Sequence, residues 1–122
     1  MTDLAIILPF YNESEIIESF LESLNNELKL LDSNILIVFI DDRSNDNSIN
    51  LISKFPFNNN ISFVILKHLV NSGHQQAIKT GLSYLSKIDF QRVLIMDSDG
   101  EDDPKNIHAL INTKGDIVVA TR

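Results

Sequence analysis

The sequence contains no cysteine among its 122 residues, which excludes disulfide bonds, thiolate metal sites and a cysteine nucleophile. Basic residues are also scarce, because 10 Lys and Arg side chains stand against 17 Asp and Glu, which gives a net charge of -7. The Lys and Arg residues form no cluster, whereas nucleic acids and anionic membrane surfaces are recognised by clustered positive charge. We therefore expect no nucleic-acid partner.

Long apolar runs are missing as well. The start, Met1-Thr2-Asp3, lacks the basic and apolar regions of a secretory signal, and no run approaches the ~20 apolar residues that span a bilayer. With 43% hydrophobic and 22% charged residues, the composition is that of an ordinary globular protein, and the length fits one domain with a real core. We expect a soluble, cytoplasmic chain without a membrane segment.

What the chain does contain is a regular alternation of short apolar runs and helical patterns. The runs are continuous rather than alternating, which is typical of strands buried on both faces of a parallel sheet. Ser14 is the expected cap of the first helix, and Pro104 opens the last one. The pattern predicts an α/β fold. The expected strands cover residues 4–10, 34–40, 61–66, 92–96 and 116–120, and the expected helices cover residues 14–31, 47–55, 75–85 and 104–111.

Polar residues follow three of the expected strands at their carboxyl ends. Ligands of parallel α/β sheets bind beyond those ends. We therefore predict a binding crevice at this edge, lined by side chains from several loops. The residues are Pro9, Tyr11, Asn12 and Glu13 with the first strand, Asp41 and Asp42 with the second, and Asp97 and Asp99 with the fourth.

The segment Asp97-Ser98-Asp99 places two carboxylates one residue apart. Carboxylates this close repel each other unless they share a cation, and Mg²⁺ and Mn²⁺ prefer oxygen ligands. Asp, Ser and Gly are also ordinary turn residues, so an acidic, solvated turn stays open as an alternative. A calcium loop is excluded, because it needs glycine at its sixth position and Gly100 falls at the fourth.

Four segments taken together resemble the family 2 glycosyltransferases. They match in order and spacing as well as in residue type, and they extend over nearly the whole chain. Within the family, the set is most similar to the branch of polyprenyl-phosphate sugar transferases and their bacterial relatives. The segments are residues 8–13 (LPFYNE), residues 41–46 (DDRSND), residues 71–77 (NSGHQQA) with Gly81, and residues 96–100 (MDSDG) with Pro104.

The resemblance implies a GT-A fold, in which helices cover both faces of a mostly parallel, Rossmann-like sheet. It also implies a metal-dependent transferase that moves a sugar, with inversion, from a UDP- or GDP-sugar to a hydroxyl of a lipid phosphate or glycan. Pro9, Tyr11 and Glu13 would hold the nucleoside, and Asp42 would accept a hydrogen bond from a base N–H. Whether Asp41 or Asp42 faces the ligand stays open, since Asp41 can instead bind amides of its own turn.

The same resemblance assigns a divalent cofactor, Mg²⁺ or Mn²⁺, to Asp97 and Asp99. Asp99 would coordinate the ion directly, and Asp97 would reach the ribose or a metal-bound water. The ion would bridge the two phosphates and neutralise charge on the leaving nucleoside diphosphate. Two further residues have structural expectations: Asp46 caps the following helix, and Gly81 packs closely against a strand.

The matched segments belong to the donor-binding half of such enzymes. We therefore expect residues 1–122 to form a single nucleotide-sugar-binding domain, with the acceptor-binding half and the catalytic base outside this sequence. In a longer form, the protein would work in the cytoplasm at the inner face of the membrane.

Three other classes of protein compete with this interpretation. A non-catalytic nucleotide-sugar-binding fragment shares the same site and stays open. A receiver domain of two-component signalling needs an acidic pair after its first strand and a Lys after its fifth, whereas here the pair 41–42 follows the second strand. A dinucleotide-binding oxidoreductase needs G-x-G-x-x-G after the first strand, and residues 9–13 contain no glycine.

Overall fold

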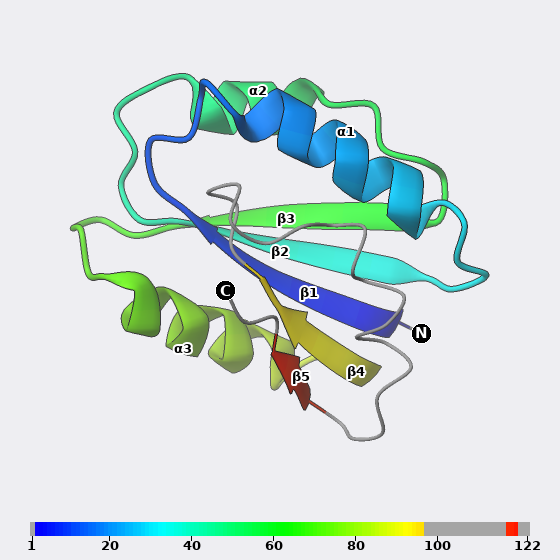
Figure 1. Ribbon diagram of the computed structural model, residues 1–122. Helices are drawn as coiled ribbons and strands as arrows, with labels where there is room; N and C mark the ends of the chain where they lie inside the picture. Colours follow the sequence, from blue (N-terminus) through cyan, green and yellow to red (C-terminus); the bar gives the residue numbers. More distant parts are fainter. Residues whose placement is uncertain (1, 97–116, 120–122) are drawn as a thin grey trace.

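The computed structural model describes residues 2–96 and 117–119, which form a parallel sheet with helices on both faces (Figure 1). Neighbouring strands are all parallel, in the order β3-β2-β1-β4-β5. The strands are β1 (Thr2–Phe10), β2 (Ile35–Asp41), β3 (Ile61–Lys67), β4 (Phe90–Ile95) and β5 (Ile117–Val119), and the helices are α1 (Ile17–Leu28), α2 (Ser48–Lys54) and α3 (His74–Leu85). The predicted α/β class and all five strands are confirmed. The helix expected over residues 104–111 lies outside the described residues.

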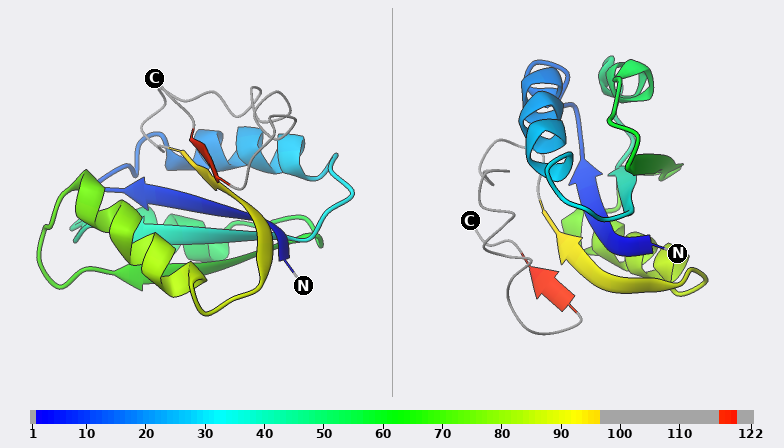
Figure 2. Two further views of the ribbon diagram at one scale, coloured as in Figure 1. Left: turned by 90° about the horizontal axis from the view of Figure 1, so that it is seen from below. Right: turned by 90° about the vertical axis from the view of Figure 1, so that its right-hand side faces the viewer.

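The order of the strands reverses beside β1. The chain first builds β1, β2 and β3 in one direction across the sheet, and it then returns to add β4 on the other side of β1. Helices α1 and α2 cover one face and α3 covers the other, as the two further views in Figure 2 show. Strands β1 and β2 are therefore buried on both faces, which explains their continuous apolar sequence.

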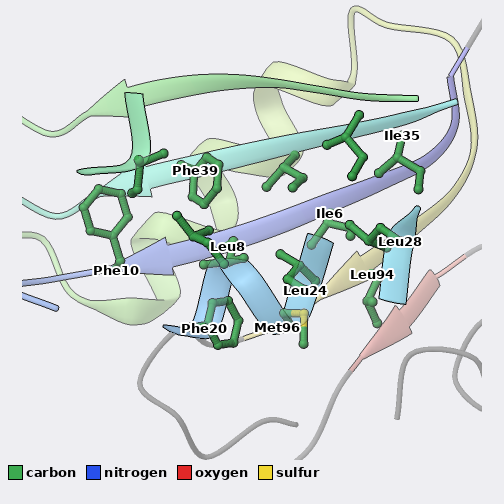
Figure 3. Close-up of a cluster of buried hydrophobic side chains, with 14 of the residues drawn as sticks. Ile6, Leu8, Phe10, Phe20, Leu24, Leu28, Ile35, Phe39, Leu94 and Met96 are labelled. Atoms are coloured by element: carbon green, nitrogen blue, oxygen red, sulfur yellow. The ribbon is translucent and has the colours of Figure 1, made fainter. Parts of the chain in front are cut away.

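The larger core lies between the sheet and the helices α1 and α2 (Figure 3). Phe39 is fully buried at its centre, with its ring 6.3 Å from that of Phe10 and 6.0 Å from that of Phe63, both in edge-on geometry. From α1, Phe20, Leu24 and other apolar residues pack onto the same cluster. Burial of each such side chain is worth about 1.5–3 kcal/mol. This core holds the strand ends that carry the polar loops.

On the opposite face, α3 approaches β1 closely enough to require a glycine. A Cβ atom added at Gly81 would lie 2.8 Å from Cγ2 of Ile7. That distance is shorter than any normal van der Waals contact, so an alanine here would push the helix and strand apart. The prediction that Gly81 packs closely against a strand is confirmed.

The bounds predicted for the first helix were wrong at both ends. Helix α1 begins at Ile17, and its cap position is Ile16, whose apolar side chain accepts no hydrogen bond from the N–H groups of the first turn. The prediction that Ser14 is the cap was wrong, because Ile16 occupies that position. The backbone N–H of Ser14 donates to Asp46 in another loop, at 3.1 Å. At the other end, the side-chain amide of Asn60 donates to the carbonyl of Leu28, at 3.1 Å, and to two carbonyls beyond it. These long-range contacts end the helix where the sequence pattern alone would continue it.

Candidate functional site

The carboxyl ends of β1 and β2 lie side by side and release two loops at the same edge of the sheet. Phe10 pairs with Asp41 in the register of the two strands, and the N–H of Asp42 donates to the carbonyl of Phe10 at 3.1 Å. Tyr11 and Asp42 are therefore the residues that come directly after the paired strand positions Phe10 and Asp41. Tyr11 keeps 46% of its surface exposed, whereas Asp42 is 7% exposed.

The end of β4 lies on the other side of β1. Ile95 pairs with Ile7, and the N–H of Met96 donates to the carbonyl of Ile7 at 3.0 Å. The fourth strand thus delivers its carboxyl end to the same edge, at the point where the strand order reverses. In α/β sheets this reversal creates the crevice that ligands use. Asp97 and Asp99, which come next in the sequence, lie outside the described residues.

Side chains of the β2–α2 loop and of the first residue of α2 hold the backbone of the β1–α1 loop. The N–H of Asn12 donates to the hydroxyl of Ser44 at 2.8 Å, and the N–H of Glu13 donates to the hydroxyl of Ser48 at 2.9 Å. In return, the side chain of Asn12 accepts from the N–H of Asn45 at 2.9 Å. Asn12 adopts a φ of 50°, a left-handed conformation that Asn tolerates better than most residues. The two loops are therefore locked together beside Tyr11.

Asp46 completes this connection. Its Oδ1 accepts from the N–H and the hydroxyl of Ser48, at 3.0 and 2.6 Å, and its Oδ2 accepts from the N–H of Ser14 at 3.1 Å. Burial raises the pKa of the Asp46 carboxyl, but the hydrogen bonds from Ser48 and Ser14 outweigh it and lower the pKa to about 2. The prediction that Asp46 caps the following helix was wrong by one residue, because the cap position of α2 is Asn47. The Asp46 carboxylate still accepts from the N–H of Ser48, the first residue of α2, and it also binds the neighbouring loop.

The two consecutive aspartates of β2 and its loop have different surroundings. Asp41 is 1% exposed, and its Oδ1 accepts from the N–H of Ser44 at 2.9 Å. The prediction that Asp41 binds an amide of its own turn is confirmed. The carbonyl of Asp41 in turn accepts from the N–H of His68 at 2.9 Å, which continues the sheet beyond β3.

Asp42 is enclosed by the segment that links β3 to α3. Its Oδ1 accepts from the N–H of Ser72 at 2.8 Å and from Nδ1 of His68 at 2.9 Å, and its Oδ2 accepts from the N–H of Gly73 at 3.0 Å. Gly73 can offer its amide there because it adopts a φ of 91°, which favours glycine. Burial raises the pKa of the Asp42 carboxyl, but the hydrogen bonds from Ser72, His68 and Gly73 together lower it. The carboxylate is therefore ionised at neutral pH.

Two side chains of this cluster were missed by the sequence analysis. The other ring nitrogen of His68, Nε2, lies 2.8 Å from Oγ1 of Thr80, and that hydroxyl reaches the carbonyl of Gln76 one helical turn back, at 3.0 Å. His68 could have been found from the topology, because it follows the strand that pairs with β2. Thr80 carries no comparable signal, since a Thr on a helix has no pattern that predicts a contact with a loop.

The remaining predicted residues occupy different places. Pro9 lies buried within β1, paired with Ile40, and Glu13 is partly buried where the first loop turns towards α1. A polar cavity of about 420 Å³ lies at the opposite edge of the sheet, lined by residues such as Asn34 and Asp89, and it includes none of the predicted residues.

No cluster of three His, Asp or Glu side chains able to hold a metal ion occurs within residues 2–96 and 117–119. Asp97 and Asp99 fit a hard divalent ion by their chemistry, because carboxylate oxygens are the ligands that Mg²⁺ and Mn²⁺ prefer. They also follow the one strand that ends beside β1 on the far side from Asp42. In the described part of the chain, no helix is long and apolar enough to cross a membrane.

The strand order, the reversal beside β1 and the polar loops at the carboxyl edge define an α/β domain of the Rossmann-like, GT-A type. The chain belongs to glycosyl transferase family 2, whose model matches residues 5–120. The resemblance to family 2 glycosyltransferases that the four sequence segments show is thereby confirmed.

One curated relative is the undecaprenyl-phosphate 4-deoxy-4-formamido-L-arabinose transferase of Proteus mirabilis (strain HI4320). It is 30% identical over 122 residues, which cover 97% of this chain and 36% of the relative. The chain therefore spans about a third of the length of the curated relatives that it first matches.

Two solved structures show the same fold. The structure of TarS 1-349 from S. aureus in complex with UDP-GlcNAc has a TM-score of 0.66 and 23% identity, over 90% of this chain and 31% of that one. The mannosyltransferase PcManGT from Pyrobaculum calidifontis, in complex with GDP-Man and Mn²⁺, has a TM-score of 0.60 and 20% identity, over 81% of this chain and 30% of that one.

Proposed function

We propose that this chain is the donor-binding domain of an inverting, metal-dependent glycosyltransferase that uses a UDP- or GDP-sugar. The observation that carries the proposal is the carboxyl edge of β1 and β2, where an exposed aromatic side chain and an ionised carboxylate follow paired strand ends. Complexes of fold neighbours with UDP-GlcNAc and GDP-Man support the donor class. Residues 1–122 act as one nucleotide-sugar-binding unit.

In this proposal the nucleoside lies against the β1–α1 loop. The ring of Tyr11 offers a face on which the base stacks, and its 46% exposure leaves that face accessible. Glu13 lies in the same loop, whose backbone is fixed by Ser44 and Ser48, and Pro9 lies two residues before Tyr11 within β1. Asp42 accepts a hydrogen bond from an N–H of the base. A bound nucleoside thus meets a surface that is already ordered, which lowers the entropic cost of binding.

The diphosphate lies towards the end of β4. Asp99 and Asp97 would hold a divalent Mg²⁺ or Mn²⁺ ion, with Asp99 as the direct ligand. When bound, the ion would supply Lewis-acid stabilisation of the negative charge on the leaving nucleoside diphosphate. The Mn²⁺ in the complex of one fold neighbour supports this cofactor.

The transfer is a displacement at the anomeric carbon. An acceptor oxygen, either a glycan hydroxyl or a phosphate oxygen of the lipid phosphate, forms the new bond to that carbon. The bond to the diphosphate oxygen breaks with its electron pair on that oxygen, and the configuration inverts. Where the acceptor is a hydroxyl, a general base that is not assigned among residues 1–122 takes its proton. The acceptor is a lipid phosphate or a glycan of the cell envelope, and the undecaprenyl phosphate in the name of the Proteus relative supports a lipid phosphate. The transfer takes place on the cytoplasmic side of the membrane.

The test is calorimetry with UDP, GDP and their sugars, with and without Mn²⁺. We expect Mn²⁺ to raise the affinity for one nucleotide at least tenfold, and Asp99→Ala to abolish that gain. Asp89→Ala is the matched control, because it removes an exposed carboxylate at the opposite edge of the sheet. Failure of every nucleotide to bind would overturn the proposal. Binding without release of nucleoside diphosphate on addition of acceptors would instead favour a non-catalytic nucleotide-sugar-binding fragment.

A further inference from the structure

The carboxylate of Asp42 is oriented by one segment of the chain, residues 68–73. Its donors are two backbone amides, of Ser72 and Gly73, and one side chain, that of His68. A backbone amide is fixed by the path of the chain, whereas a side chain can rotate. The ring of His68 is therefore the one adjustable member of this set.

The ring of His68 is itself held at both nitrogens. Nδ1 lies 2.9 Å from Oδ1 of Asp42, and it must carry the proton in that hydrogen bond, because a carboxylate only accepts. Nε2 lies 2.8 Å from the hydroxyl of Thr80 on α3. The backbone N–H of His68 also donates to Asp41 at 2.9 Å. The ring thus bridges the end of β2 and the body of α3.

The contacts divide unequally between the two carboxylate oxygens. Oδ1 accepts two hydrogen bonds, from His68 and Ser72, whereas Oδ2 accepts one within the described residues, from Gly73. Each carboxylate oxygen has about two acceptor positions. Occupation of both positions on Oδ1 fixes the plane of the carboxylate and leaves acceptor capacity on Oδ2.

We infer that His68 is a positioning residue for nucleotide recognition, which holds Asp42 so that its Oδ2 accepts a hydrogen bond from the N–H of the base. This inference rests on the proposed function, in which Asp42 faces the base. It adds that the selectivity for a base N–H depends on a ring that does not itself touch the nucleotide.

The experiment compares the affinities of the full-length protein for UDP and for 3-methyl-UDP, which lacks the N–H of the base. If the wild type prefers GDP, then GDP and 1-methyl-GDP take their place. A hydrogen bond to a charged acceptor predicts that the wild type binds the parent nucleotide about tenfold or more tightly than the methylated one. We expect His68→Leu to reduce this preference to about twofold, with the affinity for the methylated nucleotide nearly unchanged.

Two amide variants provide the matched pair. The amide of His68→Asn can replace the donor at the Nδ1 position, towards Asp42, whereas that of His68→Gln can replace the group at the Nε2 position, towards Thr80. We expect the preference for the base N–H to persist in His68→Asn and to be lost in His68→Gln. Thr80→Val removes the hydroxyl that holds Nε2 and is expected to weaken the preference by a smaller factor.

The outcomes test the role of Asp42 in nucleotide binding separately from the positioning role of His68. If the wild type binds no nucleotide, or does not distinguish the methylated one, the role proposed for Asp42 is wrong. If the wild type does distinguish them and His68→Leu and His68→Gln keep the full preference, the positioning role of His68 is wrong while the site stands. A merely structural histidine would lower the affinity for both nucleotides equally, and this result would also overturn the inference. Should His68→Leu fail to fold, the Asn and Gln pair decides.

Discussion

Two carboxylates at the same edge of the sheet, Asp46 and Asp42, anchor neighbouring loops in different ways. Asp46 is an exposed side chain whose two oxygens accept three hydrogen bonds. Two come from the N–H and the hydroxyl of Ser48, and one comes from the N–H of Ser14. Asp42 is 7% exposed, and its donors are Ser72, His68 and Gly73. Both have a lowered pKa because hydrogen bonds outweigh burial.

The difference shows that a lowered pKa alone does not distinguish a binding group from a structural one. Asp46 connects the first two loops of the sheet and accepts hydrogen bonds from the N–H and hydroxyl of Ser48, the first residue of α2, and from the N–H of Ser14. Asp42 lies directly after the strand position paired with Phe10, next to the loop of Tyr11. We therefore expect changes at Asp42 to affect both stability and nucleotide binding, and changes at Asp46 to affect mainly stability.

The largest effect is expected for Asp42→Asn. The new amide group must direct its N–H₂ towards one of the donors that now face the carboxylate, so a buried backbone N–H loses its acceptor. Such a loss lowers the free energy of unfolding by about 1–3 kcal/mol. We also expect the affinity for the preferred nucleotide to fall at least tenfold, measured by calorimetry at a temperature where the variant is folded.

Asp89→Asn is the control for Asp42→Asn, because it makes the same chemical change at an exposed position. Its free energy of unfolding should stay within about 0.5 kcal/mol of the wild type. An Asp42→Asn variant that loses stability but binds nucleotide normally would remove Asp42 from the site and would make it equivalent to Asp46.

The fold was predictable from the sequence because its signals are local and strong. Continuous apolar runs identify β1 and β2 as strands buried on both faces, and the structure gives both of them full burial over their apolar residues. The end of α1 was not predictable in this way. It depends on the side-chain amide of Asn60, which reaches back across about 30 residues to the carbonyls after Leu28, and no local pattern encodes such a contact.

The candidate site was predictable in its residues and less so in its contacts. Strand ends and motif spacing brought Tyr11 and Asp42 to one edge, as the register of Phe10 and Asp41 confirms. The partners of Asp42 depend on how the β3–α3 segment folds over β2, and this path follows from the left-handed conformation of Gly73 and the ring of His68. Sequence alone does not determine which of several polar residues in a loop contacts a given carboxylate.

A smaller effect is expected for Asp46→Asn. The charged hydrogen bonds to Ser48 and Ser14 are weakened, but the side chain is exposed and solvent screens much of their contribution. We expect the free energy of unfolding to fall by about 1 kcal/mol in urea titrations at pH 7, since the carboxylate accepts from the first N–H of α2 much as a cap side chain would. Nucleotide affinity should change less than about threefold, which follows from the absence of Asp46 from the proposed nucleotide contacts. A tenfold loss of affinity in folded protein would contradict the distinction drawn between the two carboxylates.

The smallest effect concerns the pH dependence of that stabilisation. The pKa of Asp46 is about 2 in the folded state against an ordinary value of 3.8, so the folded state holds the ionised form more strongly than the unfolded state does. The resulting stability is present above pH ~4 and is lost as the pH falls towards ~2. We therefore expect the difference in unfolding free energy between the wild type and Asp46→Asn to shrink, by less than about 1 kcal/mol, over this range. Urea titrations of both proteins at pH 5, 4 and 3 measure this difference directly, and a constant difference would mean that the carboxylate acts through its shape rather than its charge.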